Sequence, residues 1–224
     1  TPDGWTFVIP NTTKTLSYGY VYNKDITPLE TAKTNFSEVF PEASESYSGH
    51  FDHKEKVVNL PFESYMAKEP LRIDSNGRKI ILNGNRLAFL EPMESTAIGL
   101  YLDVARNVFD WIVDENSHES QKAKLAMNIF QIKKVTSNIN RMIHELQTFI
   151  LWHYTRGSVY DTPFWKEAQT KTTTIFEQPN TNFQNMVNLA KSLDYIDCRT
   201  GNVRLDYGQW PTNSIKVWYD NYIK

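Results

Sequence analysis

The chain has 224 residues and a formal net charge of −2, with 24 Lys and Arg against 26 Asp and Glu. This balance gives no sign of a nucleic-acid or anionic-membrane partner, and we expect neither. The single cysteine, Cys198, excludes a disulfide framework and a cysteine-based metal site, so we expect a reducing, cytoplasmic setting and no metal.

The first elements in chain order are predicted to be strands. Residues 5–10 form a short β-prone run, and residues 16–22 alternate with tyrosines on one face. A turn between them predicts a hairpin, in which Trp5, Phe7 and Ile9 share one strand face. A helix should follow, with Thr27 as its N-cap, Pro28 in its first turn and its end at Pro41.

The middle of the chain changes from strands to helices. Residues 44–76 predict two weak strands, and residues 77–84 a firm one. Apolar residues then recur at helical spacing from residue 95, from about 119 to 154, from 161, and over 183–193 and 214–223. We therefore predict an α+β fold, with a strand-rich part over residues 1–93 and a mostly helical part over residues 94–224.

A turn at this junction places two carboxylates, Glu91 and Glu94, before a helix. A helix N-terminus offers free backbone N–H groups and partial positive charge, which suit a small anion. Thr96 and Ala97 would supply such donors. Glu94 has two interpretations, one as a partner of the helix dipole and one as an acid group beside an anion pocket.

A second aromatic-rich segment includes His153 and Tyr154, then Tyr160, and a helix start at Phe164 and Trp165. Adjacent helical residues point to different sides, so one of the last pair would be core while the other lines a cavity. These residues are either packing anchors for a corner or the wall of a pocket for a flat ligand.

Three segments together resemble the tryptophan halogenase family of flavin-dependent halogenases. The run from Trp5 to Pro10 is similar to its Trp-x-Trp-x-Ile-Pro signature, with Phe7 at the second Trp. The run from Gly84 to Thr96 resembles its flavin-side turn. The run from Asp161 to Trp165 resembles the late aromatic segment of its substrate box.

The resemblance implies a fold and an activity. Residues 1–93 would belong to an FAD-binding, monooxygenase-like domain and the rest to a helical substrate box. Reduced FAD, supplied by a transient flavin reductase, and oxygen would turn a halide ion into hypohalous acid, which a lysine and a glutamate direct onto an electron-rich, indole-like substrate. Glu94 matches that glutamate, as polarising group or base for the ring proton.

Other roles follow from the same resemblance. Thr96 and Ala97 match the backbone halide site, and Asn85 and Ile98 match positions that line the flavin. Trp5 matches the residue that guards the route between flavin and substrate. The remaining substrate-pocket positions match His153, Tyr154, Tyr160, Phe164 and Trp165.

Departures from the family pattern modify these expectations. Ala97 stands where Gly is common, and Tyr160 stands where tryptophan-specific members carry Glu, which argues against free tryptophan as substrate. The sequence lacks the Gly-rich dinucleotide loop and the catalytic lysine, so we expect the C-terminal part of a halogenase, inactive alone. A homodimer stays open, as do two alternatives: a flavin-dependent aromatic hydroxylase and a non-catalytic helical binding module.

Overall fold

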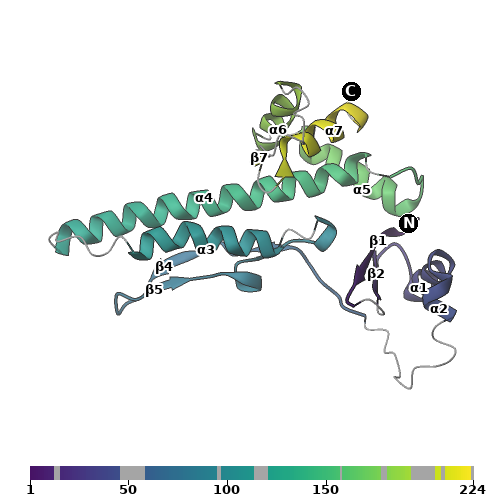
Figure 1. Ribbon diagram of the computed structural model, residues 1–224, viewed down its shortest axis with the longest axis horizontal. Helices are drawn as coiled ribbons and strands as arrows, with labels where there is room; N and C mark the ends of the chain where they lie inside the picture. Colours follow the sequence, from purple (N-terminus) through teal and green to yellow (C-terminus); the bar gives the residue numbers. More distant parts are fainter. Residues whose placement is uncertain are drawn as a thin grey trace, which may run out of the picture. The chain divides into compact units, whose positions relative to one another are not determined.

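The computed structural model describes residues 1–12, 16–45, 59–94, 97–113, 121–156, 158–177, 181–192, 205–207 and 210–222. Its short strands pair antiparallel and its helices dominate, which confirms the α+β class (Figure 1). The chain forms two compact units. Unit 1 joins Thr1–Pro61 to Leu151–Pro179, and unit 2 joins Phe62–Ile150 to Asn180–Lys224. The sequence-based division into a strand-rich flavin-binding part (residues 1–93) and a helical substrate-binding part (residues 94–224) stays a prediction.

Unit 1 begins with the predicted hairpin. Strand β1 (Gly4–Pro10) pairs antiparallel with β2 (Leu16–Tyr22), with Phe7 opposite Gly19. A Cβ at Gly19 would overlap the Phe7 ring, and a Cβ at Gly4 would overlap the carbonyl oxygen of Val21. Glycine at these two positions therefore lets the hairpin pack closely against its own side chain and backbone.

Helix α1 (Leu29–Val39) forms as expected, but Thr27 does not cap it. The residue at the cap position is Pro28, without a side-chain hydrogen bond, and the Thr27 hydroxyl donates to Asp3 Oδ1 at 3.1 Å instead. The capping prediction is therefore wrong, because a buried carboxylate competes for the hydroxyl. Pro41 ends α1 as predicted and also opens a short helix, α2 (Pro41–Glu45).

Asp3 is the polar centre of unit 1. Its carboxylate is 8% exposed and also accepts hydrogen bonds from the Tyr20 hydroxyl, at 2.6 Å, and from Asn35 Nδ2. One side chain thus joins the start of β1, strand β2, the loop before α1, and α1 itself. Satisfying a buried carboxylate by several donors offsets the cost of removing it from water.

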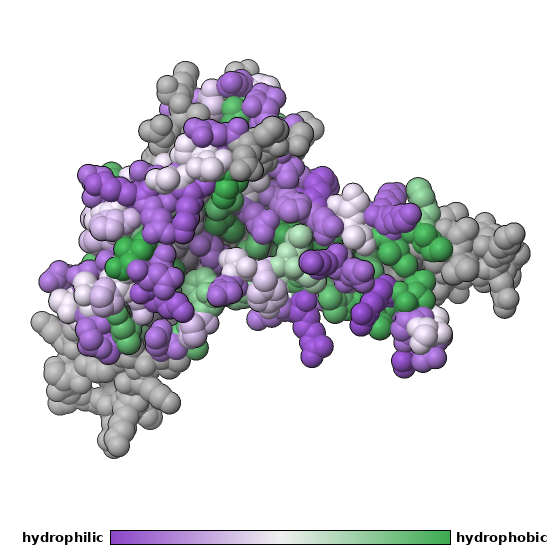
Figure 2. Space-filling model, turned by 180° about the vertical axis from the view of Figure 1, so that it is seen from behind, coloured by the Kyte–Doolittle hydropathy of each residue, from purple (hydrophilic) through white to green (hydrophobic). Residues whose placement is uncertain are grey.

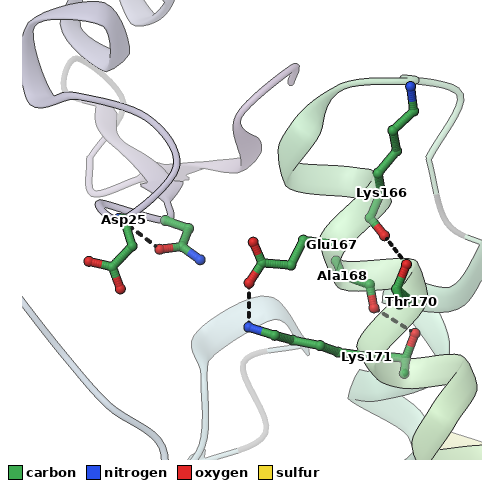
Figure 3. A network of polar contacts seen from close by, with 8 residues as sticks. Asp25, Lys166, Glu167, Ala168, Thr170 and Lys171 are labelled. Atoms are coloured by element: carbon green, nitrogen blue, oxygen red, sulfur yellow. Dashed lines mark hydrogen bonds and ion pairs between the residues drawn. The ribbon is translucent and has the colours of Figure 1, made fainter.

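Two helices complete unit 1: the C-terminal turns of α4 (Gln121–Arg156) and helix α5 (Pro163–Glu177). Figure 3 shows the polar face of α5, where Lys171 pairs with Glu167 and the Thr170 hydroxyl donates to the Lys166 carbonyl at 2.7 Å. Asp25, before α1, closes a turn through its backbone N–H to Asn23 Oδ1 at 3.0 Å. These are solvated, local contacts that stabilise each element separately.

Unit 2 contains two further strand pairs. Strand β3 (Tyr65–Met66) pairs with β6 (Ala88–Phe89), and β4 (Leu71–Ile73) pairs with β5 (Lys79–Ile81). Of residues 44–76, where two weak strands were expected, the described part contains β3 and β4, and residues 46–58 lie outside the described residues. The firm strand expected over residues 77–84 is shorter, because Gly77 (φ 77°) belongs to the turn before it.

Helices α3 (Ala97–Val113) and α4 lie side by side in unit 2 (Figure 1). The Asn107 side-chain amide lies 3.9 Å from Met142 Sδ. Buried residues spaced by about one turn line both helices: Leu100, Val104 and Val108 on α3, and Val135, Ile139, Ile143 and Leu146 on α4. The apolar repeat predicted for the second helix is therefore buried from Ile139 onward, whereas Ile129, earlier in the same repeat, is 47% exposed.

The last elements of unit 2 are α6 (Thr181–Ser192), β7 (Leu205–Tyr207), β8 (Trp210–Pro211) and α7 (Thr212–Tyr222). Sequence periodicity predicted both helices but neither strand, since two- and three-residue strands carry no readable alternation. Trp210 packs on Phe149 of α4 at a ring distance of 4.2 Å. Across the described residues, no helix is long and apolar enough to span a membrane.

The pH dependence of stability should reveal the Asp3 cluster. Burial, followed by the hydrogen bond to Asp3, raises the pKa of Tyr20 from 10.0 to about 12. Because the folded state holds this proton more tightly, its contribution is complete below pH 10 and is lost as the pH rises through about 12. The free energy of unfolding, measured with urea, should therefore fall between pH 9 and 12, and Tyr20→Phe should make this fall smaller. If the free energy of unfolding depended on pH equally in both proteins, this assignment would be contradicted.

Candidate functional site

The predicted substrate residues Trp5 and Tyr154 meet in unit 1. Trp5 lies on β1, and Tyr154 lies near the C-terminal end of α4, 149 residues later in the chain. The Trp5 indole N–H donates to the Tyr154 hydroxyl at 2.9 Å. This hydrogen bond ties strand β1 to the C-terminal end of α4.

Phe164 and Trp165, at the start of α5, join the same cluster. The Tyr154 ring lies 6.3 Å from the Phe164 ring and 5.8 Å from the Trp165 ring, and the latter two meet edge to face at 5.1 Å. Trp165 is 4% exposed, whereas Phe164 is half-buried. Trp165 is thus a core anchor, and Phe164 keeps surface that a flat ligand could contact.

The first two residues of the chain are held by α5 and the turn before it. The Trp165 indole N–H donates to the Thr1 carbonyl at 2.8 Å, and the Thr162 hydroxyl donates to the Pro2 carbonyl. Neither contact could be predicted from the sequence, because partners 160 or more residues apart produce no local sequence pattern. They fix β1 against the same corner that carries Phe164.

His153 and Tyr160, also predicted for the substrate pocket, differ from each other in exposure. His153 is buried within α4 at 9% exposure. Tyr160 is 43% exposed, and its backbone N–H binds the Ser158 hydroxyl oxygen at 3.1 Å. Hydrogen bonds and ring contacts thus bring four of the six predicted substrate residues together, and the roles of all six stay predictions.

Phe7, which replaces the second Trp of the family signature, supports Trp5 from the same strand. Their rings lie 6.1 Å apart, and the Phe7 ring covers Gly19 on the neighbouring strand. An aromatic ring over a cross-strand glycine fills the space left by the missing side chain. The orientation of Phe7 thus depends on Gly19.

Unit 2 contains the positions predicted to line a flavin. Asn85 lies in the 3-10 turn η2 (Gly84–Arg86), where the Tyr101 hydroxyl donates to its Oδ1 at 2.7 Å and the Tyr65 hydroxyl donates to its carbonyl. Burial, followed by the proximity of Tyr65, raises the pKa of Tyr101. With its oxygen engaged, the Asn85 amide presents its NH₂ group as a donor. Neither tyrosine was identified from the sequence.

In the sequence, the predicted acid and halide positions come just before α3 or at its first residue. Ala97 is its first residue and is partly buried, and Ile98 beside it is 73% exposed. Glu94 closes the 3-10 turn η3 (Pro92–Glu94), but its side chain, like all of Thr96, lies outside the described residues. The roles of Glu94, Thr96 and Ala97 therefore stay predictions. The described residues also contain no group of three or more metal-binding side chains.

A double-mutant cycle should detect the Trp5–Tyr154 hydrogen bond. Trp5→Phe and Tyr154→Phe each remove one partner, so the losses in unfolding free energy of the two single variants should sum to more than the loss in the double variant, by about 0.5–1.5 kcal/mol. Pairing Tyr154→Phe with Trp218→Phe, in unit 2, is the control and should be additive. Additivity in both cycles, measured by urea unfolding, would contradict a direct bond.

Gly19→Ala should displace the Phe7 ring. The added methyl group overlaps that ring, and overpacking of this kind costs about 1–3 kcal/mol of stability. In a Phe7→Leu background the smaller, flexible side chain should absorb most of the loss. Equal losses in the two backgrounds, measured by thermal unfolding, would show that Phe7 does not depend on Gly19.

Comparisons with known proteins give the chain a family. The profile of the family described as tryptophan halogenase matches residues 1–202. Similar solved structures include a thermophilic tryptophan halogenase from Streptomycin violaceusniger (19% identity, TM-score 0.64), a tryptophan C-6 flavin-dependent halogenase (chlorinase) from taromycin biosynthesis (18%, 0.62), and a tryptophan 6-halogenase from Streptomyces toxytricini (18%, 0.63). At these identities, the likeness concerns the fold.

Coverage of these structures is unequal. The matches include 97% of this chain but 36%, 37% and 36% of the three solved chains, so it spans about a third of their length. No curated protein matches it. The family match over most of the sequence nevertheless decides its kinship: the chain belongs to the tryptophan halogenase family.

Proposed function

We propose that this chain provides the aromatic-substrate site and the directing carboxylate of a flavin-dependent halogenase that acts on an electron-rich, indole-like compound. The observation that carries the proposal is the convergence of Trp5, Tyr154, Phe164 and Trp165 within unit 1, at the positions that resemble the family's substrate residues. Family membership supports the reaction class.

The ring cluster suits a flat aromatic substrate. Trp165 is buried and donates its indole N–H to the Thr1 carbonyl, so its ring is held in place and supports the cluster. Phe164 lies edge to face on Trp165 and keeps part of its surface exposed. An indole bound against Phe164 would gain offset or edge-to-face ring contacts.

Glu94 is the residue proposed to act on the reacting atoms. Its carboxylate would polarise the incoming halogen donor, or accept the proton that leaves the ring carbon after halogen addition. The backbone N–H groups of Thr96 and of Ala97, the first residue of α3, would hold the halide ion, as helix N-termini favour anions. These roles rest on the resemblance of the turn to the family's motif.

Flavin is implied by the family, and two described residues of unit 2 fit one edge of it. Asn85 presents an amide donor held by Tyr101, and Ile98 presents an exposed apolar side chain. A Gly-rich cradle for the phosphates is absent from the 224-residue sequence. When bound, reduced FAD would supply the oxygen activation that oxidises the halide, while Asn85 and Ile98 would orient the ring. A flavin reductase and a cytoplasmic location belong to the same proposal.

The proposal separates binding from turnover. The chain alone should bind indole or a substituted indole, measured by calorimetry, because unit 1 contains the whole ring cluster. Phe164→Ala should weaken binding roughly tenfold through loss of one aromatic contact. Val159→Ala is the matched control, since Val159 is 98% exposed. Absence of binding by the unaltered chain would contradict the proposed site.

The same chain should not halogenate by itself. With FAD, a flavin reductase, NADH, oxygen and bromide, mass spectrometry should find no halogenated or hydroxylated indole, because the sequence lacks the dinucleotide loop and the lysine that pairs with Glu94. A brominated product would show that the chain suffices for catalysis. A hydroxylated product, independent of bromide, would favour the hydroxylase alternative.

A further inference from the structure

Helix α3 is apolar on two of its faces. One face carries Leu100, Val104 and Val108, all at most 4% exposed, along the helix that lies beside α4. The second face carries Ile98, Leu102, Ala105 and Phe109. At 100° per residue these four fall within an arc of about 60°, well separated from the buried face. We call them the α3 stripe.

The α3 stripe is exposed, although its composition is that of a core. Ile98 is 73% exposed, Leu102 55% and Phe109 62%. The charged residues among the described side chains of α3, Asp103 and Arg106, pair with each other at 3.3 Å on a third face. A surface helix normally turns polar residues outward, and a helix that is apolar on most of its circumference is normally buried.

The α3 stripe begins at one of the two positions that we propose line the flavin. Ile98, its first residue, is a proposed flavin neighbour, and Tyr101 of the same helix fixes Asn85, the second one. Figure 2 shows apolar residues, in green, among the polar ones on the surface of unit 2. A polypeptide that covers this stripe would therefore also adjoin the place proposed for the flavin ring.

The lengths of the solved relatives indicate what covers it. This chain matches 36% of the thermophilic tryptophan halogenase while using 97% of its own length. Nearly two-thirds of that relative's chain therefore lies outside the matched part. We propose that the α3 stripe is the docking surface for the flavin-binding part of the halogenase fold, an inference that rests on the proposed function.

The first test uses the chain alone. Leu102→Glu places a charge in the α3 stripe, and Arg106→Glu places the same side chain on the charged face of the same helix. Because the stripe is exposed, both variants should keep the melting temperature within a few degrees of the unaltered chain. Unfolding of Leu102→Glu alone would show that the stripe is covered within the chain and would overturn the proposal. Light scattering that finds a dimer abolished by Leu102→Glu would assign the stripe to a second copy, with the same consequence.

The second test supplies the occupant. The chain is co-produced with the part of the Streptomyces toxytricini halogenase that it does not match, so that either partner can fold on the other, and the amount recovered on a tag of the chain is measured. The unaltered chain and Arg106→Glu should recover this partner equally, and Leu102→Glu at least tenfold less. Equal recovery by all three, or none by the unaltered chain, would overturn the inference. Indole binding by the same preparation tests the proposed function separately.

Discussion

The candidate substrate site depends on a few hydrogen bonds that tie the first residues of the chain to a corner about 150 residues later. Trp5 donates to Tyr154 across 149 residues, and Trp165 donates to the Thr1 carbonyl across 164. Closing so long a loop costs entropy once, and each further contact at the same place then adds stability without a comparable cost. Ring packing between Tyr154, Phe164 and Trp165 completes the cluster.

Asp3 supports this attachment from the other side of β1. Its buried carboxylate accepts from Tyr20, Thr27 and Asn35, which belong to β2, the loop before α1, and α1. The carbonyls of Thr1 and Pro2, just before β1, are bound by Trp165 and Thr162. The side chain of Trp5 therefore has little freedom to change its place. Such pre-organisation is what a pocket for a rigid aromatic ligand requires.

The sequence was sufficient for elements whose pattern is local and long. The hairpin around Gly19 and the buried C-terminal half of the α4 repeat followed from periods of two and of three to four. The cap at Thr27 was wrong, because Asp3, 24 residues away, takes the hydroxyl that the local motif would have used. The short strands β7 and β8 were missed because they contain too few residues to show alternation.

Part of the candidate site could likewise be predicted from the sequence, and part could not. Trp5, Tyr154, Phe164 and Trp165 could be named from a family resemblance, but their hydrogen bonds and ring contacts could not, because those depend on packing between distant segments. The tyrosines that hold Asn85 carry no motif and emerged only from the structure. The residues of the α3 stripe recur at helical spacing in the sequence, but only the structure shows that they are exposed.

The most direct test of this account is the behaviour of two indole N–H protons. In ¹H–¹⁵N spectra of the 224-residue chain, the signals of Trp5 and Trp165 can be assigned by their loss in Trp5→Phe and Trp165→Phe. The account predicts slow exchange with solvent for both, since each N–H is bonded within unit 1 at 2.9 and 2.8 Å respectively. Exchange of both protons at the rate of an unfolded chain would show that the corner does not assemble, and would contradict the proposed substrate site.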